Sequence, residues 1–134
     1  MEIRVWMDNW QMQCCGEPFA VGDEVSWTLR DPDTEWLESV LGSESAGGVD
    51  KAEEHHGGIG DGGTSTVGIV TSIHAVRCRY APPPGGAETV LGPVPGSGTL
   101  DAIRFADGWT PDRGELEFAG YLVRLKIDED VRPE

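Results

Sequence analysis

The residues of this chain best suited to chemistry are its three cysteines and three histidines, which fall into three short clusters. The clusters are Cys14-Cys15, His55-His56, and His74 with Cys78. Thiolate sulfur and imidazole nitrogen are the usual ligands of zinc, and a thiol beside an imidazole is the usual pair in cysteine catalysis. The clusters therefore raise two hypotheses, a zinc site and a thiol nucleophile.

Spacing restricts the zinc hypothesis. Cys14 and Cys15 are adjacent, so their side chains point in different directions and do not readily chelate one ion together. His74 and Cys78 lie on a predicted strand, where four residues span about 13 Å, so they share an ion only if the strand bends. A zinc site would need Cys14 or Cys15, one or both of His55 and His56, and either His74 or Cys78, and Asp61 could supply a fourth ligand. No cofactor is predicted. In the favoured interpretation the cysteines are buried thiols and the histidines are structural or solvated. A zinc site is the alternative.

A thiol nucleophile would use Cys14 or Cys15 with His55 or His56. No signature of a cysteine hydrolase surrounds these cysteines, and the histidines lie in a glycine-rich loop. The sequence therefore favours a protein without catalytic activity of its own.

Five tryptophans in 134 residues form a second group of candidate functional side chains. Core packing is expected to take two or three of them, and the rest are candidates for an aromatic binding surface. Trp6 lies on the strand face opposite to Ile3, and Trp109 lies in a turn. These two tryptophans are the predicted surface-binding residues, although Trp109 could instead plug one end of a barrel.

The net charge of −14 comes from 24 acids against 10 bases. Nine of the acids lie between Asp31 and Asp61, where Lys51 is the one base. Such a chain is repelled by phosphate backbones, so direct binding of nucleic acid is disfavoured. The charge favours solubility or a basic protein partner, and it also suggests an acidic decoy that mimics nucleic acid.

The sequence also bears on the compartment. It has no apolar run of about 18 residues, so no membrane span is predicted. Met1 to Asp8 has no basic segment followed by an apolar run, so no secretory signal is visible. An odd number of cysteines without a signal predicts reduced thiols in the cytoplasm.

Apolar residues alternate over several short segments, which is typical of half-buried strands. Strands are predicted at residues 3–10, 19–29 (with a turn at 22–23), 66–80, 88–91, 99–106 and 120–127. Asp33 or Thr34 could cap a short helix from about Glu35 to Leu41. Residues 43–65 are rich in glycine and acids and predict a long flexible loop, and the charged tail 128–134 is expected to fray. The chain is therefore predicted to be a single all-β domain over 1–134, a small partly open SH3-like or OB-like barrel with one short helix.

The chain also resembles an uncharacterised bacterial domain-of-unknown-function family of small proteins. The resemblance is carried by Trp6-Met7-Asp8, Cys14-Cys15-Gly16, Phe19-x-Val21-Gly22-Asp23-x-Val25-x-Trp27, His55-His56-Gly57, and Gly68-x-Val70 leading into His74. It spans nearly the whole chain and implies no activity. The role that the sequence favours is a small acidic cytoplasmic module that binds or regulates an unidentified protein partner, for which the net charge suggests a basic protein. A metal-binding protein or metalloenzyme and the acidic decoy are the alternatives.

Overall fold

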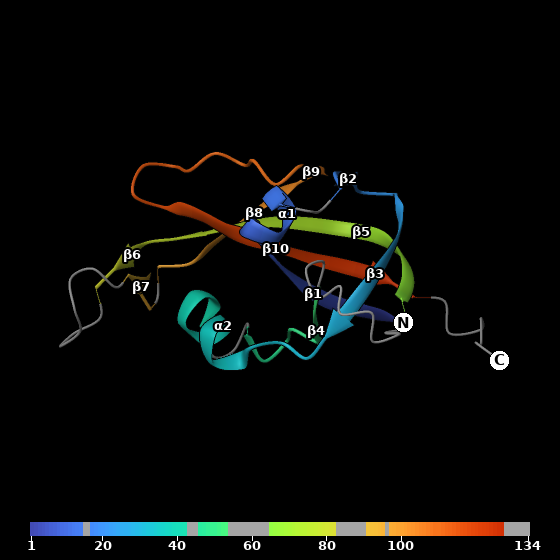
Figure 1. Ribbon diagram of the computed structural model, residues 1–134, viewed down its shortest axis with the longest axis horizontal. Helices are drawn as coiled ribbons and strands as arrows, with labels where there is room; N and C mark the ends of the chain where they lie inside the picture. The colour runs from blue at the N-terminus through green and yellow to red at the C-terminus, as the bar shows by residue number, and fades with distance from the viewer. Residues whose placement is uncertain (15–16, 43–45, 54–64, 83–90, 96, 128–134) are drawn as a thin grey trace.

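The computed structural model describes the chain except residues 15–16, 43–45, 54–64, 83–90, 96 and 128–134 (Figure 1). Its helices are α1 (Asn9–Cys14) and α2 (Thr34–Leu41). Its strands are β1 (Glu2–Asp8), β2 (Phe19–Ala20), β3 (Glu24–Arg30), β4 (Lys51–Glu53), β5 (Ser65–Cys78), β6 (Tyr80–Ala81), β7 (Gly92–Pro93), β8 (Thr99–Ile103), β9 (Phe105–Ala106) and β10 (Glu117–Lys126).

Five of the described strands close into a barrel in the order β10-β1-β4-β3-β5, because β10 pairs with β5 as well as with β1. The pairing of β1 with β4 is parallel, whereas the other pairings around the barrel are antiparallel. β8 extends the sheet by pairing with β5 over residues 73–77. The prediction of a small β-rich barrel is confirmed. The barrel is closed rather than partly open, and closure leaves no free edge around its wall.

Alternate residues of the long strands fill the interior of the barrel. The inward residues of β1, β5 and β10 include Val5, Met7, Ile73, Ala75, Tyr121, Val123 and Leu125. Each is at most 1% exposed. Burial of an aliphatic or aromatic side chain contributes about 1.5–3 kcal/mol each, so this alternation is the main source of stability.

A second core lies on the outside of the barrel, beneath α2. Trp6, Val76 and Leu122 point outward from β1, β5 and β10 and pack with Leu37 and Val40 of α2. Figure 1 shows α2 on the side of the barrel away from β2 and β9. This part of the wall is therefore buried on both faces.

Local signals explain why α2 forms. The Asp33 carboxylate accepts a hydrogen bond from the Trp36 amide at 3.2 Å, which satisfies one of the open amides of the first turn. Gly42 ends the helix with φ 89°, and its amide donates to the Glu38 carbonyl at 2.9 Å. The predicted helix from about Glu35 to Leu41 is confirmed.

Two elements differ from the sequence-based expectations. The first predicted strand ends at Asp8, and α1 follows at once, with the Asn9 side-chain oxygen accepting from the Trp10 amide at 2.8 Å. The predicted loop 43–65 was wrong for residues 51–53, which form β4 and complete the barrel, and for Ser65, where β5 begins. Ala46 and Val49, which precede β4, are buried. Residues 43–45 and 54–64 of that loop, residues 88–90 of the strand predicted at 88–91, and the tail 128–134 lie outside the described residues.

The described helices are short, and none of them has the length and apolar character needed to cross a membrane.

Candidate functional site

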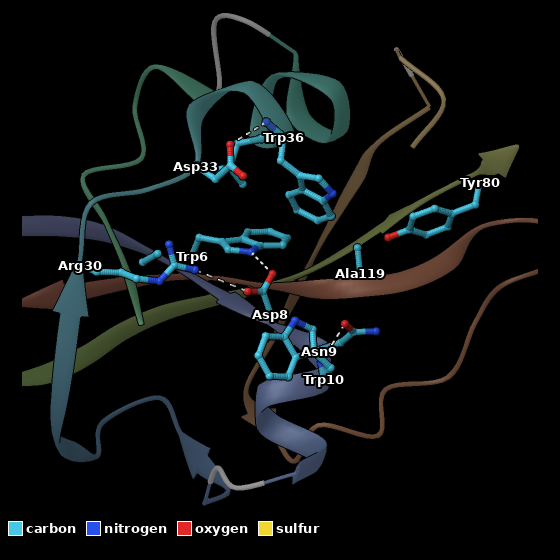
Figure 2. A pocket seen from close by; sticks show the side chains of 11 residues that line it. Trp6, Asp8, Asn9, Trp10, Arg30, Asp33, Trp36, Tyr80 and Ala119 are labelled. Carbon is cyan, nitrogen blue, oxygen red and sulfur yellow. Dashed lines mark hydrogen bonds and ion pairs between the residues drawn. The ribbon is translucent and has the colours of Figure 1, made fainter. Parts of the chain in front are cut away.

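A pocket of about 340 Å³ lies where β1 runs into α1, beside the start of α2. Its volume is near the lower end of the range of ligand pockets. β3 and β6 contribute Arg30 and Tyr80 from the two sides, and Ala119 of β10 lies at its base (Figure 2). The side chains that line it are Trp6, Asp8, Asn9, Trp10, Arg30, Asp33, Trp36, Leu37, Ala52, Tyr80 and Ala119. We call this cavity the tryptophan pocket.

Three indole rings supply the apolar walls of the tryptophan pocket. The rings of Trp6 and Trp36 have centroids 5.5 Å apart and an interplanar angle of 56°. Trp6 is only 2% exposed, whereas Trp10 at the opposite wall is 49% exposed. Figure 2 shows Trp10 across Asp8 from Trp6 and Trp36, so the rings surround the carboxylate on more than one side.

Asp8 is held in one orientation by its neighbours. The indole Nε1 of Trp6 donates to Asp8 Oδ1 at 2.8 Å, and Gln11 Nε2 donates to Oδ2 at 3.3 Å. The strand period of two places Trp6 and Asp8 on the same face, which is why the indole reaches the carboxylate. The guanidinium of Arg30 approaches Oδ2 at 3.8 Å. The pocket therefore holds a fixed acceptor group that is 17% exposed.

Asp33 shapes the pocket through α2. By capping the helix, its carboxylate fixes the first turn, and Trp36 in that turn is packed over Trp6. Asp33 also lines the pocket and adds a second negative charge beside that of Asp8.

The half-buried Tyr80, which lines the pocket, interacts with the buried Cys78. Burial raises the pKa of the Tyr80 hydroxyl well above its ordinary range, and the neighbouring Cys78, Glu117 and Asp8 add to the effect. Burial likewise raises the pKa of the Cys78 thiol, although its hydrogen bond with Tyr80 opposes the rise. Both groups are therefore neutral at physiological pH. The charged groups that line the pocket are then Asp8, Asp33 and Arg30.

These raised pKa values predict a loss of stability in alkali. Because the folded-state pKa of Tyr80 and of Cys78 lies above the ordinary values of 10.0 and 9.0, the unfolded chain loses these protons first as the pH rises. The stabilising contribution is complete below pH 9.0 and falls as the pH rises further. Urea midpoints of the wild type should therefore decrease between neutral pH and strong alkali. The Tyr80→Phe variant should show a smaller decrease, and an equal decrease would contradict the assignment.

The structure describes only some of the cysteines and histidines that the zinc hypothesis requires. Cys14 ends α1, His74 is half-buried on β5, and Cys78 is fully buried and free. His74 and Cys78 share one face of β5 with Val76 between them, as their spacing predicted. Within the described ranges, no three His, Cys, Asp or Glu side chains are grouped so that they could hold a metal ion. Cys15, His55 and His56 lie outside the described residues, so the zinc hypothesis stays a prediction.

The two tryptophans singled out from the sequence differ sharply in exposure. Trp109 is 66% exposed in its turn, with its amide donating to Asp107 Oδ1 at 2.8 Å. Trp6 is a pocket wall rather than a projecting surface residue, because α2 covers the outer face of β1. Sequence reasoning did not select Asp8, Trp10 or Trp36 as site residues. The Trp6-x-Asp8-x-Trp10 spacing is the signal that could have found the first two.

Comparison with known proteins yields one match. A family model described as a family of unknown function (DUF6578) matches residues 1–127. No curated protein and no solved structure matches the chain.

Proposed function

The chain belongs to DUF6578, a family of unknown function, and we propose that it is a non-catalytic binding module that holds a cationic side chain of a basic protein partner in the tryptophan pocket. We further propose that it acts in the bacterial cytoplasm, where the free Cys78 thiol stays reduced.

The observation that carries this proposal is a carboxylate among three indole rings that line one pocket. An aromatic ring has a negative face, and a cation placed over it gains about 0.5–1 kcal/mol at an exposed site and about 2 kcal/mol or more when desolvated. Trp36 and Trp10 line the pocket around the Asp8 carboxylate, which the N–H edge of Trp6 holds in place. Rings and carboxylate together favour a positively charged guest.

Arg30 supports the same interpretation because it is already a cation at this pocket. Its guanidinium lies 3.8 Å from Asp8 Oδ2, and its side chain is 40% exposed. The contact is long, so an incoming cation can compete with the Arg30 guanidinium for the Asp8 carboxylate. The pocket is therefore present before binding, and only the position of the Arg30 side chain has to change.

The charge of the whole chain favours a basic partner. A net charge of −14 attracts basic segments over a distance of about one Debye length and accelerates their encounter. The pocket then selects one side chain of the encountered segment. Long-range charge therefore sets the rate of association, and the pocket sets its specificity.

The proposal is tested by titrating the protein with arginine amide, with Nε-trimethyl-lysine amide and with the uncharged norleucine amide. Indole Nε1–H signals in NMR spectra report the pocket directly. Both cations should shift the Trp6 and Trp36 signals, while norleucine amide should bind at least about tenfold more weakly. Trp36→Ala and Asp8→Asn should each weaken cation binding by about tenfold, provided that circular dichroism shows an intact fold.

Trp109→Ala is the matched control, because it removes an exposed tryptophan that does not line the pocket. It should leave cation binding unchanged. Equal affinity for norleucine amide, or equal losses in Trp36→Ala and Trp109→Ala, would sink the proposal.

The acidic decoy remains the second candidate, since it rests on the net charge of −14. A decoy should bind a basic peptide with an affinity that falls steeply with salt and ignores Trp36→Ala. Pocket binding should depend on Trp36 at every salt concentration.

A further inference from the structure

Two arginines face each other on the outer wall of the barrel. Arg4 of β1 is the register partner of Arg124 of β10, and Ser72 of β5 is the partner of Arg124 on its other side. The three residues therefore form one row across three adjacent strands. We call it the arginine row. Like charges directly opposite each other on a sheet are destabilising, so a bound anion between the two arginines would relieve their repulsion.

The arginine row borders a depression of about 240 Å³. His74 lies one outward position beyond Ser72 on β5, and its register partner Leu122 lies beside Trp6. Leu100 of β8, which is 43% exposed, lies at the far side. Two guanidinium groups, an imidazole and a hydroxyl thus surround a floor formed in part by apolar side chains.

The two guanidinium groups make few ion pairs with the described residues. In the described part of the chain, the Arg4 guanidinium has no hydrogen-bond or ion-pair partner, although its backbone amide donates to Asp50 Oδ2 at 2.8 Å. Arg124 Nε is 3.9 Å from Glu2 Oε1, and both side chains are more than two-fifths exposed. Such a pair contributes little. Glu2 and Asp50 line a second depression together with both arginines, and His74 and Leu122 do not line it.

We propose that this depression binds the phosphoryl group of a small organic phosphate. Guanidinium groups donate in a fixed fork that suits phosphate oxygens, and two of them can hold a tetrahedral dianion from two directions. The Ser72 hydroxyl and the His74 ring offer further donors, while Leu100 and Leu122 offer contact to the organic body. The net charge of −14 disfavours an extended polyanion, so the ligand is a small molecule rather than nucleic acid.

This site is independent of the tryptophan pocket, because the two share no lining residue. The proposal also does not rest on the function proposed above. It adds an anionic small molecule to a protein that otherwise attracts cations.

The test is an NMR titration at constant ionic strength with inorganic phosphate, phenyl phosphate and benzoate. Phosphate should shift the signals of Ser72, His74 and the two arginines. Phenyl phosphate should bind several-fold more tightly than inorganic phosphate, and benzoate more weakly than either. Arg4→Ala and Arg124→Ala should each weaken phenyl phosphate binding by about tenfold.

Arg104→Ala is the matched control, because Arg104 is an exposed arginine outside the depression. Its loss should not change the affinity. Leu100→Ser should remove the advantage of phenyl phosphate while keeping the response to inorganic phosphate. Binding only to the native state should also raise the melting temperature of the wild type and not that of Arg4→Ala.

The proposal is overturned if millimolar phosphate leaves Ser72, His74, Arg4 and Arg124 unshifted. It is equally overturned if Arg104→Ala weakens binding as much as Arg4→Ala, since the response would then reflect net charge alone.

Discussion

Replacing Gly120 with alanine is expected to destabilise the barrel by about 3 kcal/mol or more. A Cβ atom at Gly120 would collide with the carbonyl oxygen of Met7 and lie 2.7 Å from Cζ2 of the Trp6 ring. The Met7 carbonyl belongs to paired strand β1, and the Trp6 ring is packed beneath α2, so neither can move away freely. The same shift would displace the indole that holds Asp8, so cation binding should fall along with stability.

Gly92→Ala is the matched control for this prediction. Gly92 also lies in a strand, but a Cβ atom added there meets nothing within 4 Å. Urea unfolding followed by circular dichroism measures both variants. If Gly120→Ala has the wild-type midpoint, the close approach of β1, β10 and Trp6 is not as described.

Replacing Arg77 with alanine is expected to cost about 2–3 kcal/mol. Arg77 is 5% exposed, and its Nη1 lies 2.5 Å from Asp101 Oδ2. Its Nε donates to the Pro111 carbonyl at 2.9 Å. One side chain thereby joins β5 to β8 and to the segment that precedes β10. Its removal leaves the Pro111 carbonyl without its donor, whereas Asp101, which is 36% exposed, keeps Arg113 at 3.2 Å.

Arg79→Ala provides the comparison, since it removes the same side chain two residues further along. Arg79 pairs with Glu115 at 3.4 Å, but the side chains are 53% and 83% exposed. Its loss should cost no more than about 1 kcal/mol. Equal midpoints for the two variants would show that burial of the Arg77 pair does not determine its contribution.

The sequence predicted those elements whose own residues show a clear periodicity or capping pattern. The alternation of Ile3, Val5 and Met7 predicted β1, and Asp33 with Gly42 framed α2. In contrast, β4 is three residues long in an acidic, glycine-rich stretch, and its pairing with β1 and β3 decides its conformation. α1 was missed because Asn9 starts it with no intervening turn after β1.

The tryptophan pocket was less accessible to sequence reasoning than the fold. Strand period alone places Trp6 beside Asp8, but the approach of Trp36 and Tyr80 depends on how α2 and β6 pack on the barrel. The same packing buries Trp6, which the strand pattern placed on a free face. The arginine row could not be predicted, because it depends on the register of β1, β5 and β10. Closure of the barrel sets the register between these distant strands.

The order of synthesis adds a constraint on how this protein is made. β10, the strand that pairs with both β1 and β5, is the last described strand in the chain. A nascent chain on the ribosome therefore exposes the apolar faces of β1 and β5 until β10 emerges, and such exposure invites aggregation. Chaperone binding during translation should accordingly persist until residues 117–126 have left the exit tunnel.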